Sequence, residues 1–274
     1  MSSSPSDTAP DTAQPSPRRS GLLPPWFPAP EPADLHGWWP LFGLRAETER
    51  LVLRPVADAD LPALLAAVQR GIHPTGQNPF GEVPWSQAPA QDVWRQTLQH
   101  IWRTRAATGP RTWTVQCGVW DRLGDPDGPC GGPDGELIGL QDVSAQNFHL
   151  TRTVETGSWL RHDVQGQGLG RQARTVGLVL AFDHLGALAA ETSCASWNQA
   201  SQRVSTSLGY RFNGAHVRAW GREPETVLHF RLTPEEFLRP QTPVSVTGIA
   251  PVQAFLGIPA VPTPAPAPSG ETSA

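Results

Sequence analysis

The stretch DVQGQGLGRQAR (residues 163–174) carries three glycines at alternate positions, between an apolar strand-like run and a helix-like run. Gly166, Gly168 and Gly170 therefore fall where a strand turns into a helix. Their backbone N–H groups can converge at the positive end of the helix dipole, and the missing Cβ atoms let a bulky anion approach. We predict that a phosphate or pyrophosphate binds here; a tight turn without a ligand is the alternative.

The segments on either side of this loop alternate between the strand and helix patterns. Strands are predicted by alternating or continuous apolar residues, and helices by apolar residues at helical spacing. The predicted strands are residues 50–56, 112–120, 136–145, 151–160 and 187–196, followed by a hairpin over 215–233. The predicted helices are residues 58–70, 90–107, 171–185 and 198–210. This order predicts an α/β fold with a mixed sheet.

Both ends of the chain differ in composition from the middle. Residues 1–35 are rich in Ser and Pro, and residues 259–274 in Pro and Ala, with few large apolar side chains to offset the entropy of ordering. We therefore expect two disordered tails and one folded domain over residues 36–258.

Charge, hydropathy and cysteine usage narrow the function. A net charge of −4 and a pI near 6.0 leave no basic surface for nucleic acid. No apolar run approaches the roughly 20 residues of a membrane helix, so a cytoplasmic protein without a membrane partner is expected. Cys117, Cys130 and Cys194 lack the spacing of metal ligands, which predicts small buried or loop thiols and no metal.

Two residue types exclude whole classes of enzyme. The chain contains no lysine, whereas P-loop enzymes and pyridoxal enzymes both depend on one. A dinucleotide fingerprint would read G-x-G-x-x-G, and its third glycine position holds Arg171. A different nucleotide-binding enzyme is therefore disfavoured.

Four segments in order resemble a known family. QGQGLG (residues 165–170) fits the pattern Q/R-x-x-G-x-G/A, the pyrophosphate loop of the GCN5-related N-acetyltransferases (GNAT). ETERLVLRPVADAD (47–60), ETGSWLRHDVQGQGLG (155–170) and NQASQRVSTSLGY (198–210) resemble its RimJ/RimL branch, the ribosomal-protein-alanine acetyltransferases. The resemblance covers roughly residues 45–235. It implies the GNAT acyl-CoA N-acyltransferase fold, in which two central strands splay apart.

The resemblance also implies a cofactor site. Acetyl-CoA would lay its pantetheine arm between the splayed strands, on backbone near Trp159 and Leu160, with Asn198 bonded to the pantetheine. The residues implied at the pyrophosphate are Gln165, Gly166, Gln167, Gly168, Leu169, Gly170 and Arg171. The implied reaction is direct attack by a primary amine, of a protein N-terminus or a small molecule, on acetyl-CoA in a ternary complex.

Acetyl transfer needs a neutral amine and an acid for the departing thiolate. Many family members place a Tyr seven residues after the helix-opening asparagine; this chain has Ser205 there, as the RimL branch does, so Ser205 is the predicted acid. Glu155 and Glu191, beside the expected splay, are the predicted bases. Water, His73 or His162 are the alternatives.

The acceptor side is expected in the Gly/Pro-rich loop over residues 71–89, where Phe80 and Trp85 are pocket candidates. Trp94 and Trp102, on the helix that follows, are expected in the core. Two functions stay open at this point. One is an acetyl-CoA-dependent N-acetyltransferase acting as a monomer or homodimer, and the other is a catalytically inactive acyl-CoA-binding module for sensing or interaction.

Overall fold

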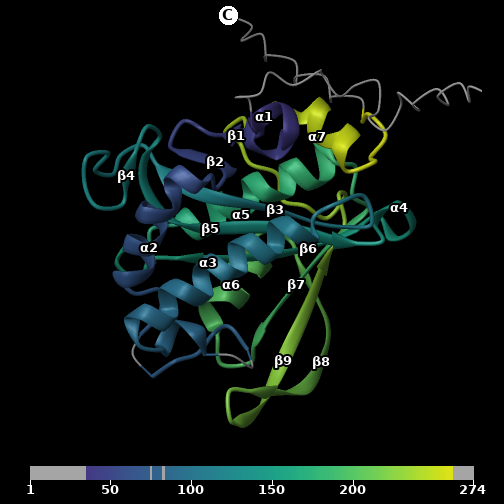
Figure 1. The fold of residues 1–274 in the computed structure, drawn as a ribbon. Helices are drawn as coiled ribbons and strands as arrows, with labels where there is room; N and C mark the ends of the chain where they lie inside the picture. The colour runs from purple at the N-terminus through teal and green to yellow at the C-terminus, as the bar shows by residue number, and fades with distance from the viewer. Residues whose placement is uncertain (1–34, 75, 82–83, 262–274) are drawn as a thin grey trace, which may run out of the picture.

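The computed structural model describes residues 35–261, apart from 75, 82 and 83. The predicted tails, residues 1–35 and 259–274, lie almost wholly outside this range. Within it, one mixed sheet has the strand order β10-β1-β2-β3-β5-β6-β7-β9-β8, with β4 beside β5 (Figure 1). The strands are β1 Arg45–Glu47, β2 Leu51–Pro55, β3 Thr112–Asp121, β4 Gly131–Gly132, β5 Gly135–Gln146, β6 Thr153–Leu160, β7 Ala189–Ala195, β8 Arg211–Trp220, β9 Glu223–Leu232 and β10 Ser245–Thr247.

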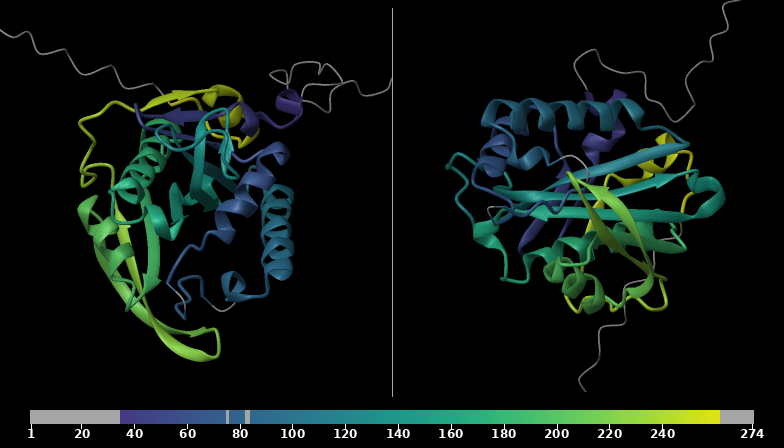
Figure 2. Two further views of the ribbon diagram at one scale, coloured as in Figure 1. Left: turned by 90° about the vertical axis from the view of Figure 1, so that its left-hand side faces the viewer. Right: turned by 90° about the horizontal axis from the view of Figure 1, so that it is seen from below.

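Helices cover both faces of the sheet (Figure 2). The helical elements are α1 Leu35–Trp38, η1 Pro40–Gly43, η2 Asp58–Asp60, α2 Leu61–Gln69, η3 Trp85–Gln87, α3 Ala90–Ala107, α4 Phe148–Thr151, η4 His162–Val164, α5 Leu169–Val179, the π-helical turn η5 Leu180–His184, α6 Gln199–Ser207 and α7 Ile249–Phe255. α2 and α3 pack on one face, through a cluster in which Leu64 and Ile101 meet Trp120 and Leu140. α5 and α6 lie on the other face.

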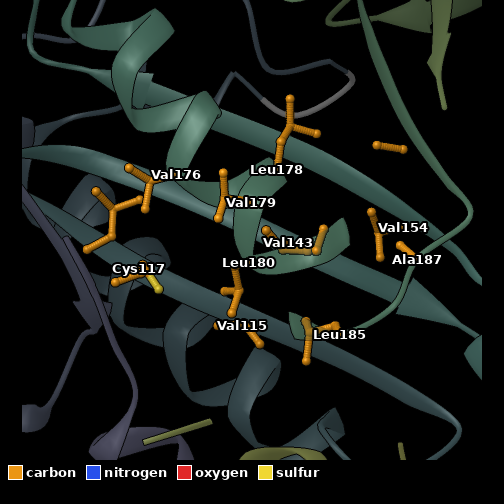
Figure 3. Close-up of a cluster of buried hydrophobic side chains, with 14 of the residues drawn as sticks. Val115, Cys117, Val143, Val154, Val176, Leu178, Val179, Leu180, Leu185 and Ala187 are labelled. Atoms are coloured by element: carbon orange, nitrogen blue, oxygen red, sulfur yellow. The ribbon is translucent and has the colours of Figure 1, made fainter. Parts of the chain in front are cut away.

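The larger core lies between α5 and the sheet. Val176 and Leu180 of the α5 region pack with Val115, Val143 and Val154 of β3, β5 and β6, and all five are at most 2% exposed (Figure 3). β-branched side chains suit the pleated surface of a sheet. This core holds in place both the helix that follows the glycine loop and the strand that precedes it.

The helix α3 corrects one expectation from the sequence. α3 spans the predicted residues 90–107, but its buried face is formed by Val93, Thr97 and Ile101, at spacings of four. Trp102 lies about 100° further round the helix and is 50% exposed, so its placement in the core was wrong. Trp94 is half-buried.

The two ends of the described chain meet at one edge of the sheet. β10 pairs antiparallel with β1, Arg45 opposite Thr247. Gly248 follows with a φ of +72°, and a Cβ there would fall 1.9 Å from the carbonyl oxygen of Gly43. Only glycine permits this approach, so η1 and the turn before α7 are packed backbone to backbone.

The cysteines and the lengths of the helices can be compared with the expectations from the sequence. Cys117, Cys130 and Cys194 are all buried free thiols, as predicted. Among the described residues, the structure contains no helix with the length and apolar character to cross a membrane.

Candidate active site at the opening between two strands

β6 and β7 run parallel but pair over only three positions, the last being Glu155 with Glu191. Two threonines close the ladder immediately beyond this pair. Thr156 Oγ1 donates to the Glu191 carbonyl oxygen at 3.3 Å, and Thr192 Oγ1 donates to the Thr156 carbonyl oxygen at 2.9 Å. Both strands then continue without pairing to each other, so a gap opens whose narrow end, the apex, lies at Thr156 and Thr192.

The β6 edge of this gap presents backbone polar groups. The Thr156 carbonyl faces β7, and alternate residues of a strand turn their N–H and C=O groups to the same side. Ser158 and Leu160 therefore turn theirs toward the gap, whereas the backbone of Trp159 faces β5, with which it pairs opposite Leu140. The Leu160 carbonyl oxygen accepts from Gln165, and backbone groups that are left without a strand partner need another one. An extended ligand with amide groups can supply it.

The glycine loop stands at the wide end of the gap. Gly166 and Gly168 have φ values of +78° and +79°, and a Cβ at either would meet no atom within 4 Å. A Cβ at Gly170 would instead contact Leu160 of β6 at 3.7 Å and Val204 of α6 at 4.0 Å. The first two glycines thus border open space at the start of α5, and the third marks where β6, α5 and α6 converge.

Gln165 fixes the loop to the structure around it. Its Nε2 donates to the carbonyl oxygen of Leu160 at 2.8 Å and to that of Ile72 at 3.0 Å. This amide therefore joins the end of β6 to the loop of residues 71–89. The amide nitrogen of Gln165 is thus engaged with two carbonyl oxygens.

A family model described as an acetyltransferase (GNAT) domain matches residues 50–211. The chain belongs to the GNAT acetyltransferase family. The predicted fold and the predicted acetyl-CoA-dependent N-acetyltransferase are thereby confirmed. The splayed strands expected for a GNAT protein are β6 and β7.

Three solved structures share this GNAT fold. RimJ of Mycobacterium smegmatis, in complex with a CoA disulfide, is 17% identical, with 73% of this chain and 91% of that chain covered and a TM-score of 0.54. A GCN5-related N-acetyltransferase of Brucella melitensis is 18% identical, with 70% of this chain and 79% of that chain covered and a TM-score of 0.53. RimL, a ribosomal L7/L12 alpha-N-protein acetyltransferase in complex with coenzyme A, is 16% identical, with 68% of this chain and 95% of that chain covered and a TM-score of 0.51.

Two further residues were predicted to bind the cofactor, Asn198 and Arg171, and both contact α6. Asn198 caps α6, its Oδ1 accepting from the Ser201 N–H at 3.1 Å. Arg171, on the first turn of α5, donates weakly to the Ser207 carbonyl oxygen of α6 at 3.5 Å. Asn198 therefore lies at the start of α6, and Arg171 contacts its end.

Ser205 lies on the inward face of α6 and is 1% exposed. Its hydroxyl donates to the Ser201 carbonyl oxygen at 3.0 Å, one turn back. Tyr210, the last residue of the segment NQASQRVSTSLGY, places its hydroxyl 2.8 Å from Thr156 Oγ1 at the apex of the gap. Burial raises the pKa of Tyr210. The signal that could have found it is that it is the only tyrosine of the chain.

The face of β6 turned away from α5 is open and acidic. Glu155 is exposed, and Glu191 is half-exposed and ion-paired with Arg231 at 2.6 Å. Asp142 of β5 lies on the same face opposite Gly157, where a Cβ would meet nothing within 4 Å. Three carboxyl groups therefore surround the apex of the gap on this side.

Sequence reasoning missed Asp142. Its Oδ2 accepts from Gln116 Nε2 at 3.3 Å, whereas Oδ1 is enclosed and has no partner in the described part of the chain. Burial raises the pKa of Asp142 to about 7. Gln116 also contacts His100 of α3 at 3.0 Å. An acidic residue in an otherwise apolar strand, LIGLQDV, was the available signal.

The described residues of the 71–89 loop lie beside the acidic face of β6. The rings of Phe80 and Trp85 pack together, with 5.3 Å between their centroids. Asn78 of the same loop accepts from Trp220 Nε1 at 2.5 Å, and Trp220 ends β8. The predicted pocket aromatics are thus in contact with each other, and their loop is joined to the tip of the β8–β9 hairpin.

A cavity of about 320 Å³ lies next to Glu191 and is lined by residues of β7, β8 and β9. His216 and His229 both line it, and their imidazole rings stack with 4.2 Å between the centroids. Burial and the neighbouring His216 lower the pKa of His229. Sequence reasoning weighed neither histidine, because only the pairing of β8 with β9 brings them together.

Proposed function

We propose that this chain is an acetyltransferase of the RimJ/RimL branch that transfers the acetyl group of acetyl-CoA to a primary amine. The observation that carries the proposal is the parting of β6 and β7 directly before a glycine loop that opens α5. The pyrophosphate would bind the backbone of residues 165–171, at the positive end of the helix. The pantetheine arm would lie along the gap, on Ser158 and Leu160, near Asn198.

The proposed reaction is a direct attack in a ternary complex. The amine nitrogen attacks the thioester carbonyl carbon, a C–N bond forms, and the C–S bond breaks. Glu155 and Glu191, at the apex of the gap, take the proton from the amine directly or through water. Ser205 supplies the proton to the departing thiolate from the α6 side.

The acceptor is proposed to arrive as an ammonium ion on the acidic face. Glu155 and Glu191 favour a cation there, because opposite charges attract more strongly in a partly desolvated site than in water. Phe80 and Trp85 would flank the substituent that the amine carries. A protein N-terminus and a small-molecule amine both satisfy these demands. An acceptor of the ribosomal-protein kind would place the reaction in the cytoplasm, with the enzyme acting as a monomer or homodimer.

A second function is supported by the geometry of the predicted acid. Ser205 is buried, its hydroxyl already donates to Ser201, and the tyrosine common at this position is absent. A chain that binds acyl-CoA without transferring the acyl group would keep the glycine loop and the gap, and would need no acid. This is the inactive binding module.

Binding and turnover separate these proposals. The melting temperature of the full chain is measured with acetyl-CoA and with NAD, because a ligand that binds only the native state raises it. Release of free CoA thiol is then followed over a panel of amines that includes peptides with different N-terminal residues. Stabilisation by acetyl-CoA together with thiol release supports the enzyme. Stabilisation without thiol release on any amine supports the binding module, and stabilisation by NAD alone contradicts both.

A further inference from the structure

Arg174 reaches into the gap from the α5 side. It lies about one and a half turns into α5 and is 4% exposed. Nη2 donates to Ser158 Oγ of β6 at 2.9 Å, and Nη1 donates to Thr192 Oγ1 of β7 at 3.3 Å. The guanidinium therefore spans the two strands just beyond their last pair, at the apex of the gap.

Within the described part of the chain, no anion balances this buried cation. No Asp or Glu side chain of the described residues lies within ion-pairing distance of Arg174, and its Nε has no hydrogen-bond partner. The contrast is Arg161, which is 2% exposed and bonded to both Glu136 and Asp163. An unpaired buried charge destabilises a protein by several kcal/mol. A residue of this kind at the apex indicates that the balancing anion comes with a ligand.

The direction of the gap identifies the part of the ligand that meets Arg174. This step rests on the proposed function. The pyrophosphate loop stands at the wide end, beyond Leu160, and the arm runs from there along β6 toward Thr156. The acyl group at the far end of the arm therefore comes to the apex, beside Ser158, Thr192 and Arg174.

We infer that the site also accepts acyl-CoA donors whose acyl group ends in a carboxylate, the malonyl and succinyl class, and that Arg174 binds this carboxylate. A guanidinium donates to a carboxylate through parallel N–H groups, and these charge-assisted bonds are stronger than those to hydroxyl groups. The transfer step is unchanged: the amine nitrogen bonds to the thioester carbonyl carbon, and CoA leaves as the thiol with one proton. The terminal carboxylate takes no part, so the product is an amide that carries a negative charge.

The test compares two donors of equal chain length. Succinyl-CoA and butyryl-CoA both carry four-carbon acyl groups, and only the first ends in a carboxylate. Titration calorimetry on the full chain is expected to show succinyl-CoA binding roughly 10- to 100-fold more tightly than butyryl-CoA, the range expected for a bond to a buried charged group. Equal affinities would overturn the inference, and this comparison needs no variant.

The variant Arg174→Met removes the charge and keeps much of the side-chain length. It is expected to erase the preference for succinyl-CoA, whereas Arg95→Met, which removes an exposed cation of α3, is expected to retain it. A preference that persists in Arg174→Met would also overturn the inference. Should wild-type chain bind none of the CoA esters, the proposed function itself fails; should it bind all of them alike, only the carboxylate site fails.

Discussion

Glu155 of β6 and Glu191 of β7 are opposite each other in the last pair of the parallel ladder, directly before the two strands part. The pairing brings two carboxyl groups from segments far apart in the sequence to the same side of the sheet. Arg231 contacts Glu191 at 2.6 Å, whereas Glu155 stands open. The two carboxylates thus differ in environment, and their roles can be separated by substitution.

Replacing Glu155 by Gln is expected to lower kcat by roughly 10²-fold, because the amide cannot accept the amine proton. Acetyl-CoA affinity should change little. The same change at Glu191 is expected to cost less than about 1 kcal/mol of stability, since its ion pair with Arg231 is surface-exposed. Steady-state kinetics and calorimetry on both variants measure these effects. Full activity in the double variant would assign deprotonation to water or to another group.

Replacing Gly168 by Val is expected to abolish the rise in melting temperature caused by acetyl-CoA, because the side chain would fill the open space beside the loop. The φ of +79° adds backbone strain to this change. Gly257→Val, at a φ of +66° far from the loop, controls for that strain. A ligand-induced shift that survives in Gly168→Val would show that the loop is only a turn.

Ser205→Ala tests the predicted acid. A hydroxyl that protonates the thiolate acts only in the transition state, so kcat should fall by roughly 10²-fold with little change in KM. Ser207→Ala on the same helix is the matched control, since its exposed hydroxyl makes a similar bond to the Val204 carbonyl oxygen at 2.8 Å. Equal turnover in the two variants would transfer the role to another donor, for which Tyr210→Phe is the next substitution.

Asp142 predicts a pH dependence of stability. Burial raises its pKa in the folded chain to about 7, from 3.8. Between these values the native state holds a proton that the unfolded state has lost, so the free energy of unfolding falls as pH rises from about 4 to about 7, then levels off. Asp142→Asn mimics the protonated form and should not show this fall.

The expected difference between wild type and Asp142→Asn grows by a few kcal/mol over this range. Urea denaturation at about pH 5, 6, 7 and 8 measures it. Burial lowers the pKa of His100, which shares Gln116 with Asp142, but both proteins contain this histidine, so the difference isolates the carboxyl group. Parallel curves for the two proteins would show that Asp142 is ionised in the folded state throughout.

The local pattern of the sequence predicts the elements that build the site. The strand over residues 151–160, the glycine loop and the helix over 198–210 each carry their signal in neighbouring residues, and the structure has them as β6, residues 165–170 and α6. β1, β10 and α7 were missed. Each is short, and β10 is a strand only through its pairing with β1, which lies about 200 residues earlier in the chain and pairs with β2 on its other side.

The buried charges could not be predicted for a related reason. Arg174 lies in RQARTVGLV, where spacing alone allows it an exposed or a buried place. Its burial depends on where β6 and β7 part, which is set by tertiary packing. The setting of Asp142 likewise depends on tertiary packing, because its hydrogen-bond partner Gln116 lies on β3 and contacts His100 of α3. Trp102 shows the opposite error, because an aromatic residue near the apolar stripe of a helix can still face water.

The pairing of β10 with β1 has a consequence for synthesis of the chain. A nascent polypeptide leaves the ribosome N-terminus first and begins to fold as it emerges. The stretch matched by the family model, residues 50–211, is therefore exposed well before residues 245–247, and during that interval β1 has an unpaired outer edge. Such edges invite association with other chains. The outer edge of β1 is therefore shielded only once β10, the last strand of the described residues, has been synthesised and has paired with it.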